Sequence, residues 1–154
     1  MSIIILYGIP ILGIFMGYLS NANMSTYMLH SSALLGLLGT VGISEGIKYG
    51  IIGNTNPRPH GARNCNLWCN DGEQEGRPGM PSSHAALVAF FVGFYYPYLT
   101  NTYVAIALIL YGLLVLVSRY MKHCHSIEQL LVGTVLGIVL SILVHRIGTV
   151  MRLF

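Results

Sequence analysis

Apolar residues gather in five runs along this chain of 154 residues, and polar segments separate the runs. The runs cover residues 3–19, 27–52, 83–99, 102–117 and 127–144. A helix that crosses a bilayer needs about 20 predominantly apolar residues, with about 17 as the lower limit. Each run meets or approaches that length. The pattern therefore predicts an all-α polytopic membrane bundle of about five transmembrane helices, in a single domain over residues 1–154.

Composition supports lipid as the solvent for much of this bundle. The chain is 54% hydrophobic and only 8% charged, whereas soluble domains are about a quarter charged. The net charge of +3 is too small to indicate nucleic acid. The first run lacks a basic leader and an A-x-A-like cleavage site, so we expect it to be retained. We predict a multi-pass integral membrane protein with the lipid bilayer as its partner and no nucleic-acid partner. The sequence specifies no oligomeric state.

Three polar clusters lie where apolar runs meet loops, at residues 48–59, 81–84 and 118–129. A long loop over residues 53–80 connects the first two clusters, and loops of that length are usually functional or disordered. Because both of its ends carry a cluster, we favour a functional loop. Five alternating crossings place this loop and the 118–126 connection on the same face as the N-terminus. The three clusters are therefore expected to meet at one membrane boundary.

The clusters contain cations and histidines with almost no carboxylate nearby, which is typical of a site for phosphate esters or anhydrides. Pro81-Ser82-Ser83-His84 is typical of a helix start, because Ser is a favoured N-cap residue. The free N–H groups at a helix start can bind phosphate. His84 is then expected to face the same anion from the first turn. The alternative is a capping motif with a solvated histidine.

The third cluster contains a second histidine with a candidate partner. His125 and Gln129 are four residues apart, so their side chains share a helical face. The Gln129 amide oxygen can accept a hydrogen bond from one imidazole nitrogen and direct the other outward. Glu128 is a rival for this orienting role. Arg119 is either an interfacial anchor or, beside a nucleophilic histidine, a phosphate clamp.

Two further cations belong to the first cluster. Lys48 follows Glu45 by three residues, so an ion pair within one helical turn is an alternative to phosphate contact and does not exclude it. Arg58 lies between Pro57 and Pro59, which stiffen the backbone around its charge.

Together, Lys48…Arg58-Pro59, Pro81-Ser82-Ser83-His84 and Ser118-Arg119-x5-His125 resemble the three-part signature of the type-2 phosphatidic acid phosphatase superfamily. That signature reads K-x6-RP, PSGH and SR-x5-H-x3-D. The resemblance implies an all-helical core shared with bacterial acid phosphatases and vanadium haloperoxidases. It also implies a metal-independent phosphohydrolase that needs no cofactor.

The resemblance implies roles for individual side chains. His125 is expected to attack phosphorus and form a phosphohistidine, His84 to protonate the leaving oxygen, and Gln129 to orient His125. The groups expected to hold the phosphoryl oxygens are three cations and a helix start: Lys48, Arg58, Arg119, Ser82 and the backbone N–H groups around Ser83.

The chain departs from the signature in two ways. Nine residues, not six, separate Lys48 from Arg58, so either the loop carries an insertion or Lys48 is not the equivalent lysine. Gln129 stands where most of the superfamily has Asp. Gln129 and Ser83 are similar to the dolichyldiphosphatase branch, which hydrolyses polyprenyl diphosphates.

These features predict a membrane lipid phosphatase acting on polyprenyl or dolichyl diphosphate. The alternatives are a phosphatidic acid phosphatase and a non-catalytic membrane protein that binds lipid phosphate, the latter supported by Gln129 and the stretched first motif. A vanadate-dependent haloperoxidase fits a short membrane-embedded chain less well. Similarity to the dolichyldiphosphatase branch implies the endoplasmic reticulum with a lumenal active site, whereas the distribution of Lys and Arg between the two faces does not decide the orientation.

Cysteines and glycines add two structural expectations. If the loop is lumenal or extracellular, Cys65 and Cys69 can form a local disulfide, and otherwise they are free thiols. As metal ligands they are a weak signal. The small-residue spacings in residues 42–46 and 133–137 (Gly-x3-Gly) predict two places where helix backbones approach closely.

Overall fold

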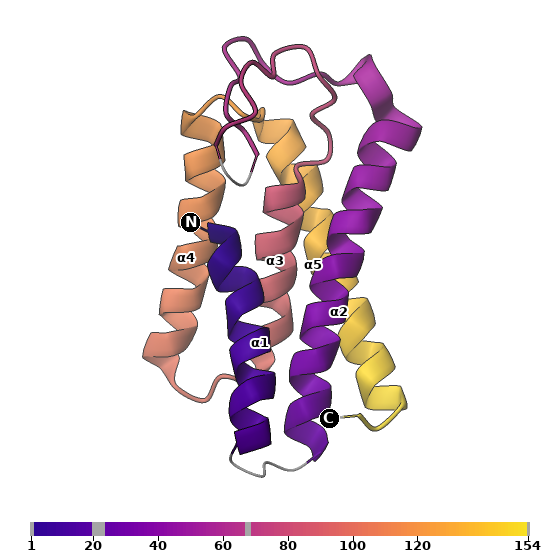
Figure 1. Ribbon diagram of the computed structural model, residues 1–154, viewed down its shortest axis with the longest axis vertical. Coiled ribbons are helices and arrows are strands. Elements are labelled where there is room, and N and C mark those ends of the chain that lie inside the picture. The colour runs from indigo at the N-terminus through magenta and orange to yellow at the C-terminus, as the bar shows by residue number, and fades with distance from the viewer. Residues whose placement is uncertain (1, 20–23, 67–68, 154) are drawn as a thin grey trace.

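The computed structural model describes residues 2–19, 24–66 and 69–153, and within these ranges the regular structure is helical, without strands. The α-helices are α1 (Ser2–Leu19), α2 (Met24–Gly46), α3 (Ser83–Tyr95), α4 (Thr102–Met121) and α5 (Ile127–Val150). They run alternately up and down as a bundle, and the long loop arches over one end (Figure 1). The predicted all-α architecture is confirmed.

Three helical segments are long and apolar enough to cross a membrane, at Met24–Thr55, Thr102–Met121 and Ile127–Val150. Large apolar side chains such as Leu114 and Val139 point outward, as in a surface that faces lipid. The chain is therefore a membrane protein. The other two expected crossings are shorter, because α1 contributes an apolar stretch over Leu6–Tyr18 and α3 has 13 residues.

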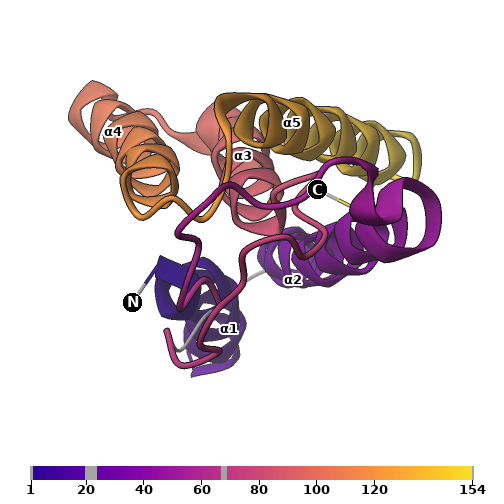
Figure 2. The ribbon, with the colours of Figure 1, turned by 90° about the horizontal axis from the view of Figure 1, so that it is seen from above.

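Helix α3 lies at the centre of the bundle, with the other four helices around it (Figure 2). Phe90 and Phe94 are fully enclosed, at 0% exposure. The helix ends at Tyr95, and a 3₁₀ turn at Tyr96–Tyr98 with Pro97 inside it follows. The apolar run at residues 83–99 is therefore a buried core helix followed by a turn.

Glycines bring α5 against the start of α3. A Cβ atom added at Gly133 or Gly137 would collide with the α3 backbone, in the latter case with the Ala86 carbonyl. The predicted close approach is thus confirmed for α5. It is wrong for α2, because a Cβ added at Gly42 or Gly46 meets no atom within 4 Å.

The end of α2 is irregular. A π-helical turn at Ile47–Ile52 and a 3₁₀ turn at Gly53–Thr55 follow the α-helix before the long loop begins. The two arms of the loop are joined by backbone hydrogen bonds from Arg58 N–H to the Arg77 carbonyl (2.8 Å) and from Asn64 N–H to the Gly72 carbonyl (2.7 Å). The loop therefore has a defined path across the end of the bundle.

A disulfide ties this loop to the connection between α4 and α5. It joins Cys65 to Cys124, which are 59 residues apart, while Cys69 is a free, exposed cysteine. The local bridge considered between Cys65 and Cys69 is therefore wrong. Cys65 and Cys124 are buried together, whereas the sulfur of Cys69 lies 3.5 Å from the Lys122 ammonium near solvent.

Candidate active site

A cavity of about 380 Å³, lined by charged, polar and apolar side chains, opens at the loop end of the bundle. Five of the side chains predicted to form the site line it: Lys48, Arg58, Ser83, His84 and His125. They come from the end of α2, the long loop, the first turn of α3 and the connection before α5. The three sequence clusters therefore meet at one place, as the predicted topology required.

His125 is buried at 2% exposure, and its ring is held by the first turn of α5. Its Nδ1 lies 3.1 Å from Oε1 of Gln129, and the same oxygen accepts a hydrogen bond from the Ser126 N–H at 3.2 Å. The Ser126 hydroxyl in turn accepts from the Gln129 N–H, which completes a capping box. Glu128 is exposed on the neighbouring position. The side chain beside His125 is therefore Gln129.

The surroundings of Gln129 fix which end of its amide faces the histidine. Its Nε2 donates to the Pro57 carbonyl (2.8 Å) and to Oδ1 of Asn56 (2.7 Å), so Oε1 faces His125. Because Oε1 can only accept, this network assigns the proton of the neutral imidazole to Nδ1. The lone pair of His125 is then on Nε2, and this nitrogen can act as a nucleophile.

The neutral form of this ring is strongly favoured. Burial is the main cause that lowers the pKa of His125 to about 3, and the nearby Arg58 cation lowers it further. The hydrogen bond with Gln129 acts in the opposite direction, as does a smaller backbone contribution from Gly79. His125 is therefore unprotonated throughout the neutral range.

Lys48 is held by two partners inside the protein. Its ammonium donates to Oε1 of Glu45 at 2.6 Å and to the Ser83 hydroxyl at 2.7 Å, and the Ser83 hydroxyl also donates to Glu45. The Glu45–Lys48 ion pair considered from the sequence is thus present, and Lys48 nevertheless lines the cavity. The predicted ion pair is confirmed, and phosphate contact by Lys48 stays a prediction.

The segment between Lys48 and Arg58 is irregular. The π-helical turn at Ile47–Ile52 and the 3₁₀ turn after it contain most of the nine intervening residues. Both cations line the same cavity despite this long spacing. Single-turn π-helices are often found at functional sites.

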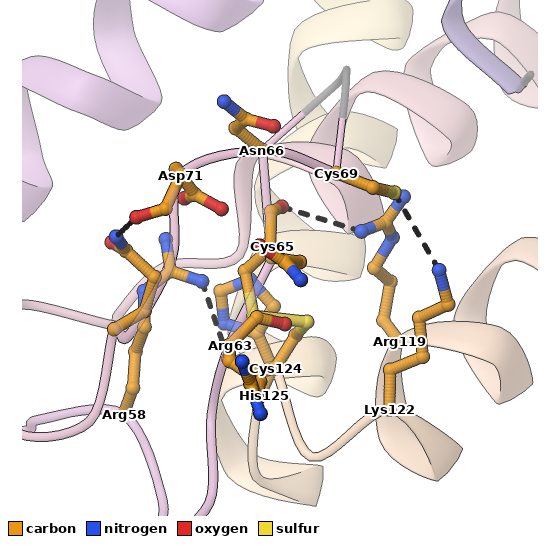
Figure 3. Close-up of a disulfide and its surroundings, with 12 residues drawn as sticks. Arg58, Arg63, Cys65, Asn66, Cys69, Asp71, Arg119, Lys122, Cys124 and His125 are labelled. Atoms are coloured by element: carbon orange, nitrogen blue, oxygen red, sulfur yellow. Dashed lines mark hydrogen bonds between the residues drawn. A yellow bond between two sulfur atoms is a disulfide. The ribbon is translucent and has the colours of Figure 1, made fainter.

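Arg58 and Arg119 are each bound to a backbone carbonyl. Nη1 of Arg119 donates to the Cys65 carbonyl at 3.3 Å, and Nη1 of Arg58 donates to the Cys124 carbonyl at 3.3 Å (Figure 3). Among the described residues, the Nε atoms of both arginines and Nε2 of His84 are buried without a hydrogen-bond partner. Unpaired buried groups of this kind are rare and costly, and a bound anion would supply acceptors for the two guanidinium groups.

The sequence model of the PAP2 superfamily matches residues 29–151, which is most of the chain. The chain belongs to the PAP2 superfamily. No curated protein sequence and no solved structure matches it. The match covers all three polar clusters and the helices that carry them, from α2 to the end of α5. Membership supports a phosphatase acting on lipid phosphates.

Three of the predicted PAP2 site residues do not line the cavity: Arg119, Ser82 and Gln129. Ser82 is fully buried, and its hydroxyl accepts a hydrogen bond from the Ala85 N–H as the N-cap of α3. Gln129 is buried behind His125, against which it packs. Gly79 lies directly beside the Gln129 amide, where a Cβ would approach within 2.6 Å of it. The loop glycine therefore allows the contact that orients the histidine.

The site contains two carboxylates. Glu45 and Asp71 both line the cavity, so the expectation of almost no carboxylate nearby is wrong. The spacing to Lys48 identified Glu45 in the sequence, but not its second partner, Ser83, which lies in a distant segment. No sequence spacing relates Asp71 to the cavity, because the loop path alone brings it there.

Proposed function

We propose that this PAP2 protein hydrolyses the phosphate or diphosphate of a membrane lipid through a phosphohistidine on His125. The observation that carries the proposal is the cavity in which His125, His84, Lys48 and Arg58 meet, at the end of a bundle of apolar helices. The assignment of the His125 lone pair to Nε2 provides the nucleophile.

In the first step, Nε2 of His125 attacks phosphorus while the bond from phosphorus to the leaving oxygen breaks. His84 gives its proton to that oxygen. Burial, and after it the neighbouring cations, hold the pKa of His84 well below its ordinary value. A bound phosphate anion offsets those cations and so favours the protonated ring that this step requires. In the second step, water attacks the phosphohistidine, His84 takes a proton from the water, and phosphate leaves with His125 restored.

Charge neutralisation by fixed donors supplies the remaining catalysis. Lys48, Arg58 and Arg119 are proposed to hold the phosphoryl oxygens, together with the backbone N–H groups around Ser83 at the start of α3. One donor directed at developing charge contributes roughly 3–4 kcal/mol to the transition state. Ser82 contributes by capping the helix that presents these N–H groups.

The substrate is proposed to be an amphiphile whose headgroup enters the cavity while its tail stays in lipid. Aromatic and aliphatic side chains from three helices also line the cavity: Tyr7, Val41 and Leu87. Polyprenyl diphosphate is favoured because Gln129 and Ser83 are similar to the dolichyldiphosphatase branch. Phosphatidic acid is the second candidate.

The proposed location is a membrane of the secretory pathway, such as the endoplasmic reticulum, with the cavity facing the lumen. The Cys65–Cys124 bridge supports this orientation, because disulfides persist in oxidising compartments.

The alternative of a non-catalytic protein that binds lipid phosphate rested on Gln129 and on the long spacing of the first motif. Its second argument is weakened because Lys48 lines the cavity despite the spacing.

The test is phosphate release by purified protein in detergent, across a panel of lipid monophosphates and diphosphates, with His125→Ala as the matched control. We expect release from polyprenyl diphosphate to be fastest, to persist in EDTA and to be inhibited by vanadate. A preference for phosphatidic acid would replace the substrate assignment. If wild type and His125→Ala release phosphate equally slowly, the protein is not this enzyme.

A further inference from the structure

The disulfide occupies a particular place relative to the candidate active site. Cys65 comes from the long loop, and Cys124 directly precedes His125. Both are buried, at 1% and 0% exposure, and with Ala62 they form a small cluster separate from the main core. The bridge is therefore the covalent link between the loop and the connection that carries the proposed nucleophile.

Each bridged cysteine also binds one arginine of the site through its backbone carbonyl. The loop cysteine, Cys65, accepts from Arg119 of α4, while Cys124 of the α4–α5 connection accepts from Arg58 of the loop. The two hydrogen bonds cross the bridge in opposite directions (Figure 3). Each arginine is thus held by the segment to which it does not itself belong.

We propose that the Cys65–Cys124 bridge positions both arginines of the phosphate clamp, so that activity depends on the bridge being closed. This inference rests on the proposed function, because it concerns the same site. The unpaired, buried Nε atoms of Arg58 and Arg119 remain available for phosphoryl oxygens only while both guanidinium groups are held in place. Cys65 and Cys124 are positioning residues, and neither contacts the reacting atoms.

Opening the bridge loosens both arginines at once. A dithiol such as dithiothreitol breaks the S–S bond, leaves two thiols and is itself converted to its cyclic disulfide. The loop can then move relative to the α4–α5 connection, which weakens both crossing hydrogen bonds. A site that faces an oxidising compartment would be active there and weakened on reduction.

The first measurement counts thiols in the purified protein by alkylation and mass spectrometry. We expect one alkylated cysteine, Cys69, before reduction and three after it. Three alkylated cysteines in untreated, folded protein would overturn the proposal.

The second measurement compares the kinetics of Cys65→Ser with those of Cys69→Ser, whose thiol is exposed and unbridged. We expect Cys65→Ser to lower kcat/KM for polyprenyl diphosphate about tenfold, which corresponds to about 1.4 kcal/mol. The loss should appear mainly in KM, with a matching rise in the inhibition constant of vanadate. Cys69→Ser should behave as wild type. Unchanged KM and vanadate inhibition in Cys65→Ser would contradict the proposal.

Two further comparisons separate positioning from general loosening. If the bridge acts through the two arginines, Cys65→Ser should cost less in an Arg119→Ala background than in wild type, because only the Arg58 contact is then left to lose. A general structural defect would cost the same in both backgrounds. Wild type treated with dithiothreitol should acquire the kinetics of Cys65→Ser and recover on reoxidation. That comparison decides the matter if the variant does not fold.

Failure of the proposed function gives a different result. If oxidised wild type releases no phosphate from any lipid, the function is wrong. The bridge can then still be tested by the thermal stabilisation that vanadate confers. We expect that stabilisation to be larger for oxidised than for reduced protein, and equal stabilisation would overturn the inference.

Discussion

The two sides of the cavity are built in different ways. On one side, glycines of α5 pack against the backbone at the start of α3, and both helices begin with side-chain caps. His84 and Gln129 lie on the first turns of these helices, and His125 lies directly before the N-cap of α5. On the other side, Lys48 lies in a π-helical turn and Arg58 in a long loop.

This difference follows what each group must do. In the proposed mechanism, attack on phosphorus and proton transfer require a defined nitrogen at a defined distance. His84 lies on the closest helix pair, and His125 lies directly before it. A cation acts through its charge over a longer range and has a flexible side chain, so an irregular segment can supply it. The spacing of the first motif can therefore stretch while the second and third motifs keep theirs.

Removing the nucleophile should have the largest effect on the histidine side. We expect His125→Ala to lower kcat by at least about 10³-fold, because no other side chain that the structure describes presents an unprotonated nitrogen oriented in the same way. Rapid quench of wild type with labelled substrate should trap a phosphoprotein that is stable in base and labile in acid. Near-normal turnover by His125→Ala would place the nucleophile elsewhere.

Filling the contact between α3 and α5 should have the next largest effect. Gly137→Ala forces a Cβ against the Ala86 carbonyl, and overpacking of this kind costs about 1–3 kcal/mol. Gly42→Ala is the matched control, because its Cβ meets nothing and Ala favours a helix by up to about 1 kcal/mol over Gly. Thermal unfolding in detergent measures both. Equal melting temperatures would mean that α3 and α5 do not set the geometry of the histidines.

Gln129 tests how finely His125 is oriented. We expect Gln129→Ala to lower kcat about tenfold, which is about 1.4 kcal/mol and a reasonable size for one orienting hydrogen bond. The control is Glu128→Gln, whose side chain is exposed and should matter little. A larger loss in the control would make Glu128 the orienting residue.

The same position predicts a change in pH dependence. The pKa of His125 is lowered to about 3, so this group should not impose an acid limb near pH 6.5 on kcat/KM in wild type. Gln129→Asp places a carboxylate beside the ring and raises that pKa, so the acid limb should move to higher pH. Identical kcat/KM profiles for wild type and Gln129→Asp would contradict this account.

The same lowered pKa makes folding stability depend on pH. Unfolding exposes a histidine with the ordinary pKa of about 6.5. The stability contributed by the buried neutral ring is therefore lost as pH falls from about 6.5 towards 3.

The smallest effect is expected on the cation side. Glu45→Gln leaves Lys48 without a charged partner, so its attraction for phosphate should increase and KM should fall about threefold, or about 0.65 kcal/mol. Glu73→Gln is the control, because Glu73 is exposed in the loop and lies outside the cavity. A rise in KM for Glu45→Gln would mean that the carboxylate positions Lys48 more than it neutralises it.

Hydropathy and short motifs predicted the helices and the meeting of the three clusters. Hydropathy could not distinguish α3 from a lipid-facing helix, because burial in protein and burial in lipid select the same residues. The Gly-x3-Gly spacing identified a surface that allows close approach, but the partner helix decides whether one occurs. It does so at Gly137 and does not at Gly42.

Other features depend on contacts between distant segments. The Cys65–Cys124 pairing could not be read from spacing, because three cysteines leave the connectivity open. The support of Gln129 by Asn56 and Pro57, more than 70 residues away, likewise requires the path of the loop. The π-helical turn leaves the apolar pattern of its run unchanged and so gives no hydropathy signal.

The shortness of α3 has a consequence for membrane insertion during synthesis. Its 13 residues span about 20 Å, less than the roughly 30 Å of a hydrocarbon core, and its first turn carries His84. We expect the translocon to accept α3 only together with α4, as a hairpin. The cavity at the loop end of the bundle is then completed only when α5 emerges from the ribosome, since α5 brings Gln129 and the glycines that pack on α3. The catalytic end of the bundle would thus be assembled by the last helix to be made.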